Sequence, residues 1–192
     1  MVYIAENIFK DIYPVIASQI VVKTGISKGK VLDIGTGSGA LARAIYELGD
    51  FDIVAIDSKK DMCEAARYYI ARENKCIEIV NASVENMPFE DDTFDLIISR
   101  GSVFFWKDKY LAFKQIYRVL KQGGFTYIGG GFGNGELAEK ITNIMESRYP
   151  EWKMYVKKRM ESIPDILNSL NRLGLPFELI NDDSGMWIML KK

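Results

Sequence analysis

The chain has 192 residues, of which 48% are hydrophobic and 27% are charged, a composition typical of a folded globular domain rather than of a disordered segment. Lysine and arginine number 25 and aspartate and glutamate 26, and the resulting formal charge of −1 argues against binding of long nucleic acids by phosphate neutralisation. The absence of histidine excludes Ser-His and Cys-His nucleophile pairs and any zinc site that needs imidazole.

The two cysteines, Cys63 and Cys76, form no CxxC motif, so we expect neither a disulfide framework nor a metal site. The first residues lack the charged-then-apolar pattern of a secretory signal. No apolar run reaches the roughly 18 residues of a membrane span. These features predict a soluble cytoplasmic protein without a membrane partner.

Short β-branched runs alternate with longer helical patterns, which predicts a parallel sheet with helices on its faces. An amphipathic helical stretch opens the chain at 4–22, and Pro14 is expected to break or restart it. Five strands are then expected at 30–34, 51–56, 76–80, 94–99 and 125–129, with helices at 40–48, 59–72 and 109–120. Gly123 and Gly124 are expected to end the last of these helices.

The pattern changes after the fifth predicted strand. A glycine-rich run at 129–135 predicts a flexible segment. Mostly helical sequence follows at 136–159, interrupted near Pro150, then a separate helix at 164–173, and strands at 177–180 and 186–190 around a turn at 181–185. The last two strands predict an antiparallel hairpin at the end of the sheet.

The first predicted strand runs directly into three alternating glycines, Gly35, Gly37 and Gly39, and then into a helix. Glycines let the backbone turn tightly and let a ligand lie against it. Asp33 precedes the first glycine, and Asp57 ends the second strand, where an acid can accept both hydroxyls of a ribose. This segment predicts a nucleoside-binding turn.

Three interpretations of this turn compete. Residues 35–40 also satisfy G-x-G-x-x-A, so a dinucleotide site is a rival, and a tight turn without a ligand is a third interpretation. Asp33 favours a ligand that carries an ammonium group, because its carboxylate would repel a pyrophosphate. A phosphate loop at 25–31 is excluded by its spacing and by the lack of Ser or Thr after the lysine.

Four stretches in the same order resemble one family: VLDIGTGSGALA, VAID, NASVENMPFEDDTFDLIIS and VLKQGG. They are similar to the class I S-adenosylmethionine-dependent methyltransferases, especially the type-11 group. The resemblance implies a Rossmann-like three-layer α/β sandwich with a seven-stranded, mostly parallel sheet and an antiparallel C-terminal hairpin strand. It also implies a single domain, 1–192, with a helical cover at 1–29, a cofactor-binding core at 30–135, and helices with the hairpin at 136–192.

The resemblance implies that S-adenosylmethionine is the cofactor and assigns it a site. Asp33 and the turn would hold the methionine part, Asp57 the ribose, and the remaining residues the sugar, the adenine edge and the sulfonium. The implied set is Asp33, Gly35, Thr36, Gly37, Gly39, Asp57, Ser58, Met62, Ser83, Val84 and Ser99. Ser83 stands where the family usually has Asp, and a hydroxyl bonds the adenine amino group less strongly than a carboxylate does.

Candidates for the chemistry are few. In this family the opening helix covers the cofactor, so Tyr13, Asp11 and Glu6 are candidate bases, although each equally suits a structural or solvated position. Arg100 would either orient an anionic acceptor or pair with a nearby acid. The residues after Ser99 lack the Asn/Asp-Pro-Pro-Tyr/Phe motif, which weighs against methylation of bases or of glutamine.

The sequence therefore predicts a methyltransferase that acts by in-line displacement on a small-molecule acceptor, with nucleic acid an unexpected partner. Positioning can drive this reaction without a histidine. Two alternatives stay open: a nicotinamide-dependent reductase, for which Tyr110 and Lys114 have a Y-x-x-x-K spacing, and a non-catalytic S-adenosylmethionine-binding protein. The methyl acceptor and the oligomeric state are not predicted.

Overall fold

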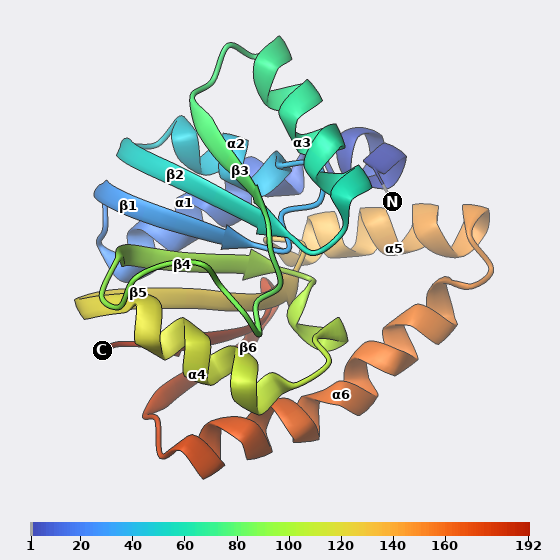
Figure 1. The fold of residues 1–192 in the computed structure, drawn as a ribbon. Coiled ribbons are helices and arrows are strands. Elements are labelled where there is room, and N and C mark those ends of the chain that lie inside the picture. Colours follow the sequence, from blue (N-terminus) through green and yellow to red (C-terminus); the bar gives the residue numbers. More distant parts are fainter. Residues whose placement is uncertain (1) are drawn as a thin grey trace.

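A seven-stranded sheet runs through the middle of the molecule in the computed structural model, which describes residues 2–192 (Figure 1). Met1, the first residue of the predicted cover 1–29, lies outside the described residues. The strands are β1 (Lys28–Ile34), β2 (Asp50–Asp57), β3 (Ile77–Asn81), β4 (Phe94–Arg100), β5 (Leu120–Gly131), β6 (Phe177–Asp182) and β7 (Gly185–Leu190). The helices are η1 (Ile4–Ile8), α1 (Ile12–Thr24), α2 (Ala40–Tyr46), α3 (Lys60–Arg72), η2 (Val103–Phe105), α4 (Lys109–Val119), α5 (Gly135–Arg148) and α6 (Trp152–Leu173).

The strand order is β3-β2-β1-β4-β5-β7-β6. Neighbouring strands from β3 to β5 pair in parallel, whereas β7 lies between β5 and β6 and is antiparallel to both. The predicted Rossmann-like fold, with its mostly parallel sheet and antiparallel terminal hairpin, is confirmed. The helices lie on both faces of the sheet (Figure 1).

Alternate residues of the strands feed two hydrophobic cores. In β1, Val31 packs into the core beneath α1 and α2, while Leu32 and Ile34 face the core that includes α4. Ile16 of α1 and Ile116 of α4 are fully buried in the first and second of these cores. A strand that is covered on both faces buries consecutive residues, which explains its unbroken apolar sequence.

Helix α4 ends earlier than predicted. The backbone of Leu120 is already extended, its side chain is fully buried, and it pairs with Phe94 of β4. Gly123 and Gly124 therefore lie inside β5, next to a shift in its register, instead of ending the helix. Strand pairing with a residue distant in sequence overrides the local glycine signal.

The glycine run after the fifth strand also differs from its prediction. Gly129, Gly130 and Gly131 are buried residues of β5, and Gly129 and Gly131 pair with β7. A Cβ atom at either of these two positions would overlap the backbone of Met186 or Ser184. The glycines thus permit close approach of the hairpin, and residues 129–131 form paired strand instead of a loop.

Two prolines have different effects on their helices. Pro14 lies in the first turn of α1, after an interruption that follows Phe9, so it restarts the helix as predicted. Pro164 lies inside α6, which continues unbroken, and the separate helix predicted at 164–173 is therefore wrong. Ile166 and Leu170 are fully buried against the sheet. Their burial offsets the cost of about 3 kcal/mol for an internal proline.

Candidate functional site

The candidate site lies where the carboxyl ends of β1, β2 and β4 meet. Strand β1 is flanked by β2 on one side and by β4 on the other, so the chain reverses its direction of travel across the sheet at this point. Open parallel sheets bind ligands at such a switch point. The N-terminal segment and α5 lie at the same end of the strands (Figure 1).

The glycine turn is fixed by backbone hydrogen bonds to β2. The amides of Gly35 and Thr36 donate to the carbonyl oxygen of Ile56 at 2.8 and 3.0 Å. Gly37 has a φ of +59°, and no atom lies within 4 Å of the position that its Cβ would occupy. Gly39 also has positive φ, +80°, and precedes α2. The turn therefore presents bare backbone to an open space, where a ligand can approach closely.

Asp33 lies beneath this turn and is 2% exposed. The Thr36 hydroxyl donates to its carboxylate over 2.6 Å. Burial raises the pKa of Asp33 to about 7, with a further contribution from the charge of Asp57, while the hydrogen bonds from Thr36 and the Ala42 amide oppose the rise. A buried carboxylate of this kind gains a compensating charge when a cation binds beside it.

Asp57 ends β2 on the other side of the turn. One carboxylate oxygen accepts the Gly37 amide at 3.0 Å and the other accepts the Lys59 amide at 2.9 Å. Each oxygen keeps a further lone pair with which it can accept a hydroxyl. Ser58 beside it is exposed, and Met62 is half-buried in the first turn of α3.

The hydroxyl of Ser38 has no hydrogen-bond partner within residues 2–192, although the side chain is only 3% exposed. Buried hydroxyls are normally paired, so this atom is suited to a ligand that carries a hydrogen-bonding group. The sequence prediction missed Ser38, for which the only signal was its place inside the glycine turn. The open turn, the unpaired hydroxyl and the two carboxylates together fit a cationic nucleoside ligand.

Ser83 and Val84 lie in the loop after β3. Val84 is buried, whereas the half-buried Ser83 hydrogen bonds with the carboxylate of Glu85. Glu85 also accepts the Lys107 amide at 2.9 Å, which ties this loop to the one before α4. Burial raises the pKa of Glu85, but the hydrogen bonds from Ser83 and from nearby amides outweigh it, so the pKa is lowered overall. The sequence prediction missed Glu85, an acid two residues beyond the position where the family has Asp.

Ser99 is fully buried near the end of β4. Its hydroxyl lies 2.6 Å from that of Ser102, which also bonds to the Ile34 carbonyl at 3.1 Å and accepts the Trp106 indole at 3.0 Å. A Cβ at Gly35 would overlap Ser102. The Ser99 hydroxyl is thus engaged in joining β4 to β1 beneath the turn.

Arg100 follows Ser99 at the end of β4. Its Nε and Nη2 atoms each donate to the Gly131 carbonyl at 3.2 Å. The guanidinium lies over the ring of Phe9 at 4.7 Å, with the rings of Phe132 and Tyr13 at 5.6 and 5.7 Å. Within residues 2–192 Arg100 makes no ion pair with an acid. Of the two alternatives predicted for it, pairing with a nearby acid is therefore not observed.

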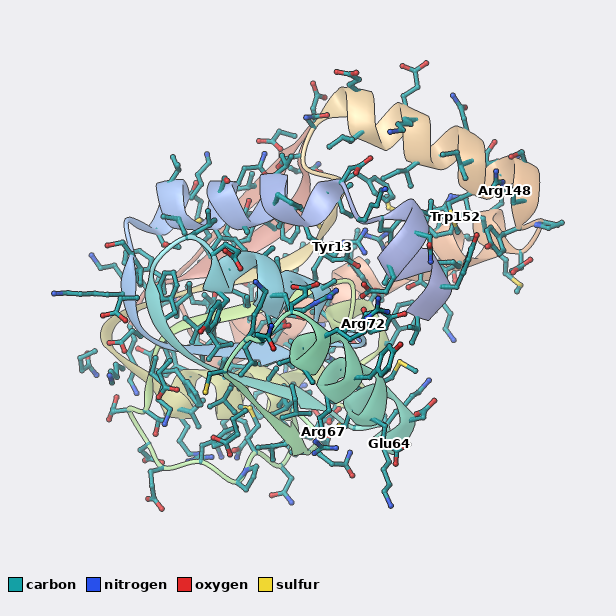
Figure 2. The ribbon with its side chains drawn as sticks, turned by 90° about the horizontal axis from the view of Figure 1, so that it is seen from above. Tyr13, Glu64, Arg67, Arg72, Arg148 and Trp152 are labelled. Carbon is teal, nitrogen blue, oxygen red and sulfur yellow. The ribbon has the colours of Figure 1, made fainter. Side chains whose placement is uncertain are left out.

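The three candidate bases have different surroundings. Tyr13 is a buried residue of the first turn of α1 (labelled in Figure 2), and burial, together with the charges of Glu6 and Asp33, raises its pKa despite the opposing influence of Arg100. Its phenol is therefore protonated at neutral pH and is suited to donate a hydrogen bond. Glu6 pairs with Arg43 at 2.8 Å, and Asp11 pairs with Lys140 at 3.2 Å.

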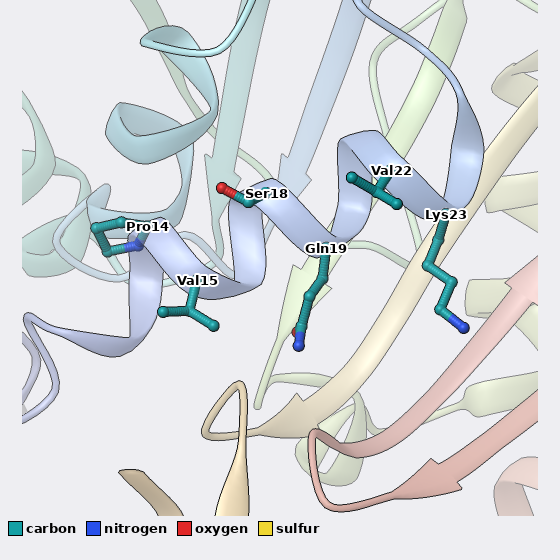
Figure 3. A pocket seen from close by; sticks show the side chains of 6 residues that line it. All are labelled: Pro14, Val15, Ser18, Gln19, Val22 and Lys23. Atoms are coloured by element: carbon teal, nitrogen blue, oxygen red, sulfur yellow. The ribbon is translucent and has the colours of Figure 1, made fainter. Parts of the chain in front are cut away.

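Two cavities flank this region. One, of about 490 Å³, follows α1 and contains none of the predicted site residues; Figure 3 shows Pro14, Val15, Ser18, Gln19, Val22 and Lys23 around it. The other, of about 420 Å³, is bounded by Phe104, Gly130, Phe132, Trp152 and Arg159, among others. The second cavity adjoins Arg100, because Phe132 belongs to its wall and also contacts the Arg100 guanidinium.

Two searches of the described chain gave negative results. Across residues 2–192, no three acidic or cysteine side chains are grouped so that they could hold a metal ion. Over the same range, every helix is too short or too polar to cross a membrane.

Comparisons with known proteins agree with this geometry. A family model described as a methyltransferase domain matches residues 32–128. A solved structure of a candidate S-adenosyl-L-methionine-dependent methyltransferase from Methanococcus maripaludis is 45% identical, with a TM-score of 0.96 over 100% of this chain and 90% of that one. A phosphoethanolamine N-methyltransferase from Haemonchus contortus, in complex with phosphomonomethylethanolamine and S-adenosylhomocysteine, is 25% identical, with a TM-score of 0.65 over 86% of this chain and 38% of its own.

Curated relatives are larger proteins. The 2-methyl-6-phytyl-1,4-hydroquinone methyltransferase 1 of Oryza sativa is 32% identical over 53% of this chain but only 30% of its own length. The residues matched by the family model include the glycine turn, both carboxylates and the end of β4. The chain belongs to the class I S-adenosylmethionine-dependent methyltransferase family.

Proposed function

We propose that this protein transfers a methyl group from S-adenosylmethionine to a small-molecule acceptor. The observation that carries the proposal is the open glycine turn between two carboxylates, one of them buried at Asp33 and the other on Asp57. Family membership favours this function over the alternative of a nicotinamide-dependent reductase. Tyr110, which the reductase alternative would use, lies beneath the guanidinium of Arg172 of α6, whose carbon is 4.7 Å from the centre of the ring.

The residues of the turn suit the parts of this cofactor in order. Asp33 would compensate its ammonium group, Ser38 and the Gly37 backbone would contact the methionine part, and Asp57 would accept the ribose hydroxyls. Ser58, Met62, Ser83 and Val84 would surround the sugar and the adenine. When bound, S-adenosylmethionine supplies a methyl group on an already activated sulfonium. The chain then contributes chiefly proximity and orientation.

The acceptor side is proposed to lie beyond the end of β4. Tyr13 and Arg100 are its candidate polar groups, and a protonated Tyr13 would orient the acceptor by donating a hydrogen bond. The relatives named above act on small molecules, a hydroquinone and phosphoethanolamine, which supports a small-molecule acceptor over a nucleic acid. In-line transfer needs no metal ion.

We also propose an organisation and a location for the chain. Residues 1–29 cover the cofactor, 30–135 bind it, and 136–192 form the acceptor side and the edge of the sheet. Cys63 and Cys76 are both free thiols, and a reducing cytoplasm is the compartment that suits them.

A thermal shift experiment tests the cofactor. The protein is heated with S-adenosylmethionine, S-adenosylhomocysteine or NADH, and a ligand at 100 times its dissociation constant adds about 2.7 kcal/mol to the free energy of unfolding. We expect both adenosyl compounds to raise the melting temperature and NADH to leave it unchanged. A rise with NADH alone would reject the proposed cofactor.

Replacement of Asp57 tests the ribose contact. Asp57→Ala should weaken the binding of S-adenosylhomocysteine at least about tenfold in titration calorimetry, since it removes charge-assisted hydrogen bonds. Asp52→Ala is the matched control, because Asp52 lies on the same strand, exposed, and pairs only with Lys30, at 3.8 Å. Equal affinities for the two variants would show that the ribose lies elsewhere.

Turnover separates an enzyme from a non-catalytic binding protein. The protein is incubated with methyl-labelled S-adenosylmethionine and a metabolite extract, and the label in products is measured. We expect label to appear in small molecules, and to appear more slowly with Asp57→Ala. Tight cofactor binding with no transferred label would favour the non-catalytic alternative.

A further inference from the structure

Two arginines lie close to the cavity beyond β4: Arg159 lines it, and Arg100 contacts Phe132 of its wall. Arg159 comes from α6, and its guanidinium lies over the ring of Phe104 at 4.4 Å. A Cβ at Gly130 would overlap the same guanidinium, so this glycine gives Arg159 its room. Arg100 reaches the neighbouring Gly131 carbonyl from the end of β4. The two cations thus contact adjacent residues of β5.

Neither cation is neutralised by the chain. Within residues 2–192 no carboxylate lies within ion-pair distance of Arg100 or Arg159. The two acids of the cavity wall have partners already: Glu146 pairs with Lys153 at 3.8 Å, and Asp182 accepts the Ser184 amide at 2.9 Å. Half-buried charges of one sign without a counterion are costly, and an anionic ligand removes that cost.

The charge of Arg100 affects the pKa of Arg159, and both arginines affect the pKa of Tyr155. Burial, together with the positive charge of Arg100, lowers the pKa of Arg159 to about 10, while Tyr155 opposes the change. Burial raises the pKa of Tyr155, while both arginines oppose that rise. Arg100, Arg159 and Tyr155 therefore form one electrostatic cluster.

Aromatic rings surround this cluster. Tyr155 stacks on Trp152 at 5.5 Å and lies 5.0 Å from Phe105, and Phe132 lies between the cavity and Arg100. Figure 2 labels Trp152 at the start of α6. The aromatic residues that line the cavity itself, Phe104, Phe132 and Trp152, accommodate an apolar or aromatic body, while the guanidinium groups suit a planar or tetrahedral oxyanion.

The cluster adjoins the proposed methyl donor site. Tyr13 lies close enough to both Asp33 and Arg100 for each charge to act on its pKa. Resting on the proposed function, we propose that the methyl acceptor is a small molecule with an oxyanionic group, a carboxylate or a phosphate, held by Arg159 and Arg100 in the cavity between β5, η2 and α6. The remainder of the acceptor then lies along the aromatic wall, with its reacting atom toward the glycine turn.

Titration calorimetry with simple probes tests this assignment. Benzoate and phenyl phosphate carry the two oxyanions on the same ring, and benzamide is the neutral counterpart. Each is titrated into the full chain, with and without saturating S-adenosylhomocysteine, in a phosphate-free buffer. We expect saturable binding of one or both anions, at least about tenfold tighter than that of benzamide. Which anion binds more tightly identifies the oxyanion.

Variants of α6 locate the binding. Arg159→Gln should weaken anion binding at least about tenfold, and Arg159→Lys, which keeps the charge, should weaken it less. Arg172→Gln is the matched control, because Arg172 lies on the same helix and also over an aromatic ring, that of Tyr110 at 4.7 Å. The Arg172→Gln variant should bind the anions as tightly as the wild type does.

Two results would overturn the proposal: benzamide binding as tightly as the anions to the wild type, or equal anion binding by Arg159→Gln and Arg172→Gln. The first comparison needs no variant, so it holds even if a variant misfolds. Binding of S-adenosylhomocysteine is measured in the same titrations. If the wild-type protein does not bind S-adenosylhomocysteine, the proposed function is contradicted. If it binds S-adenosylhomocysteine but neither anion, only the proposed acceptor class is contradicted.

Discussion

At the scale of single residues, Asp33 shows how burial prepares a group for a ligand. Its carboxylate has given up water for one hydroxyl, that of Thr36 at 2.6 Å, and one backbone amide. Its pKa of about 7, against an ordinary 3.8, measures the cost of holding a negative charge there. A cation beside Asp33 would lower that cost, so the free energy stored at this residue is available for binding.

The raised pKa of Asp33 predicts a pH dependence. Between about pH 4 and pH 7 the folded state holds this proton more tightly than the unfolded state, so the contribution of Asp33 to stability falls as pH rises through about 7. Asp33→Asn removes the effect. In thermal unfolding, the melting temperature of Asp33→Asn should rise relative to that of the wild type between about pH 5 and about pH 8. A constant difference between the two melting temperatures over this range would contradict the assignment.

At the scale of elements, one arginine connects three helical segments. Arg43 of α2 is 8% exposed and contacts Glu6 of η1 through both carboxylate oxygens at 2.8 Å. It also bonds to Glu73, the residue that ends α3, and lies over Tyr69 at 5.2 Å. The N-terminal segment is thus attached to α2 by a buried ion pair.

Removal of Glu6 should weaken this attachment. Glu6→Ala leaves the buried Arg43 charge with Glu73 as its remaining carboxylate partner, and we expect a loss of about 2 to 4 kcal/mol in urea unfolding. Glu161→Ala is the matched control, since Glu161 pairs with Lys157 at 3.9 Å on the exposed side of α6. Its effect should be about 0.5 kcal/mol or less. Similar losses in both variants would mean that the Glu6 contact contributes no more than a surface pair.

At the scale of the whole molecule, the sheet separates two cores. Ile16 of α1 packs into the core on one face and Ile116 of α4 into the core on the other, and both side chains are fully buried. Each strand of the central sheet supplies residues to both faces, as β1 does with Val31 and Leu32. The two cores therefore share their backbone but not their side-chain contacts.

This separation predicts additive mutational effects. Ile16→Ala and Ile116→Ala should each lower the free energy of unfolding by about 2 to 5 kcal/mol. Because the two sites share no contacts, the double variant should lose the sum to within about 0.5 kcal/mol. Chemical denaturation followed by tryptophan fluorescence measures all three. A coupling well above that margin would mean that the two faces rearrange together.

Much of the fold and of the local geometry of the candidate site could be predicted from the sequence. The strand-turn-helix segment around Gly37, with Asp33 and Asp57 at two strand ends, is specified by residues that are close together in the chain. Apolar periodicity located the strands and most helices, because it records which face of each element is buried. The start of β5, with Gly123 and Gly124 inside the strand, and the course of α6 through Pro164 were predicted wrongly. The pairing of Leu120 with Phe94 determines where β5 begins, and the burial of Leu170 keeps α6 continuous past its proline.

The length, the charge and the absence of histidine determined which chemistries were excluded, and four sequence stretches, two of which hold the glycine turn and its two acids, indicated the family by resemblance. Only the tertiary structure placed Arg159 beside Arg100, left Ser38 without a partner and gave the Ser99 hydroxyl to Ser102. The physical reason is the range of the interactions. Local backbone conformation and periodic burial are encoded in neighbouring residues, whereas the surroundings of a charge or a hydroxyl depend on segments that meet only after the chain has folded.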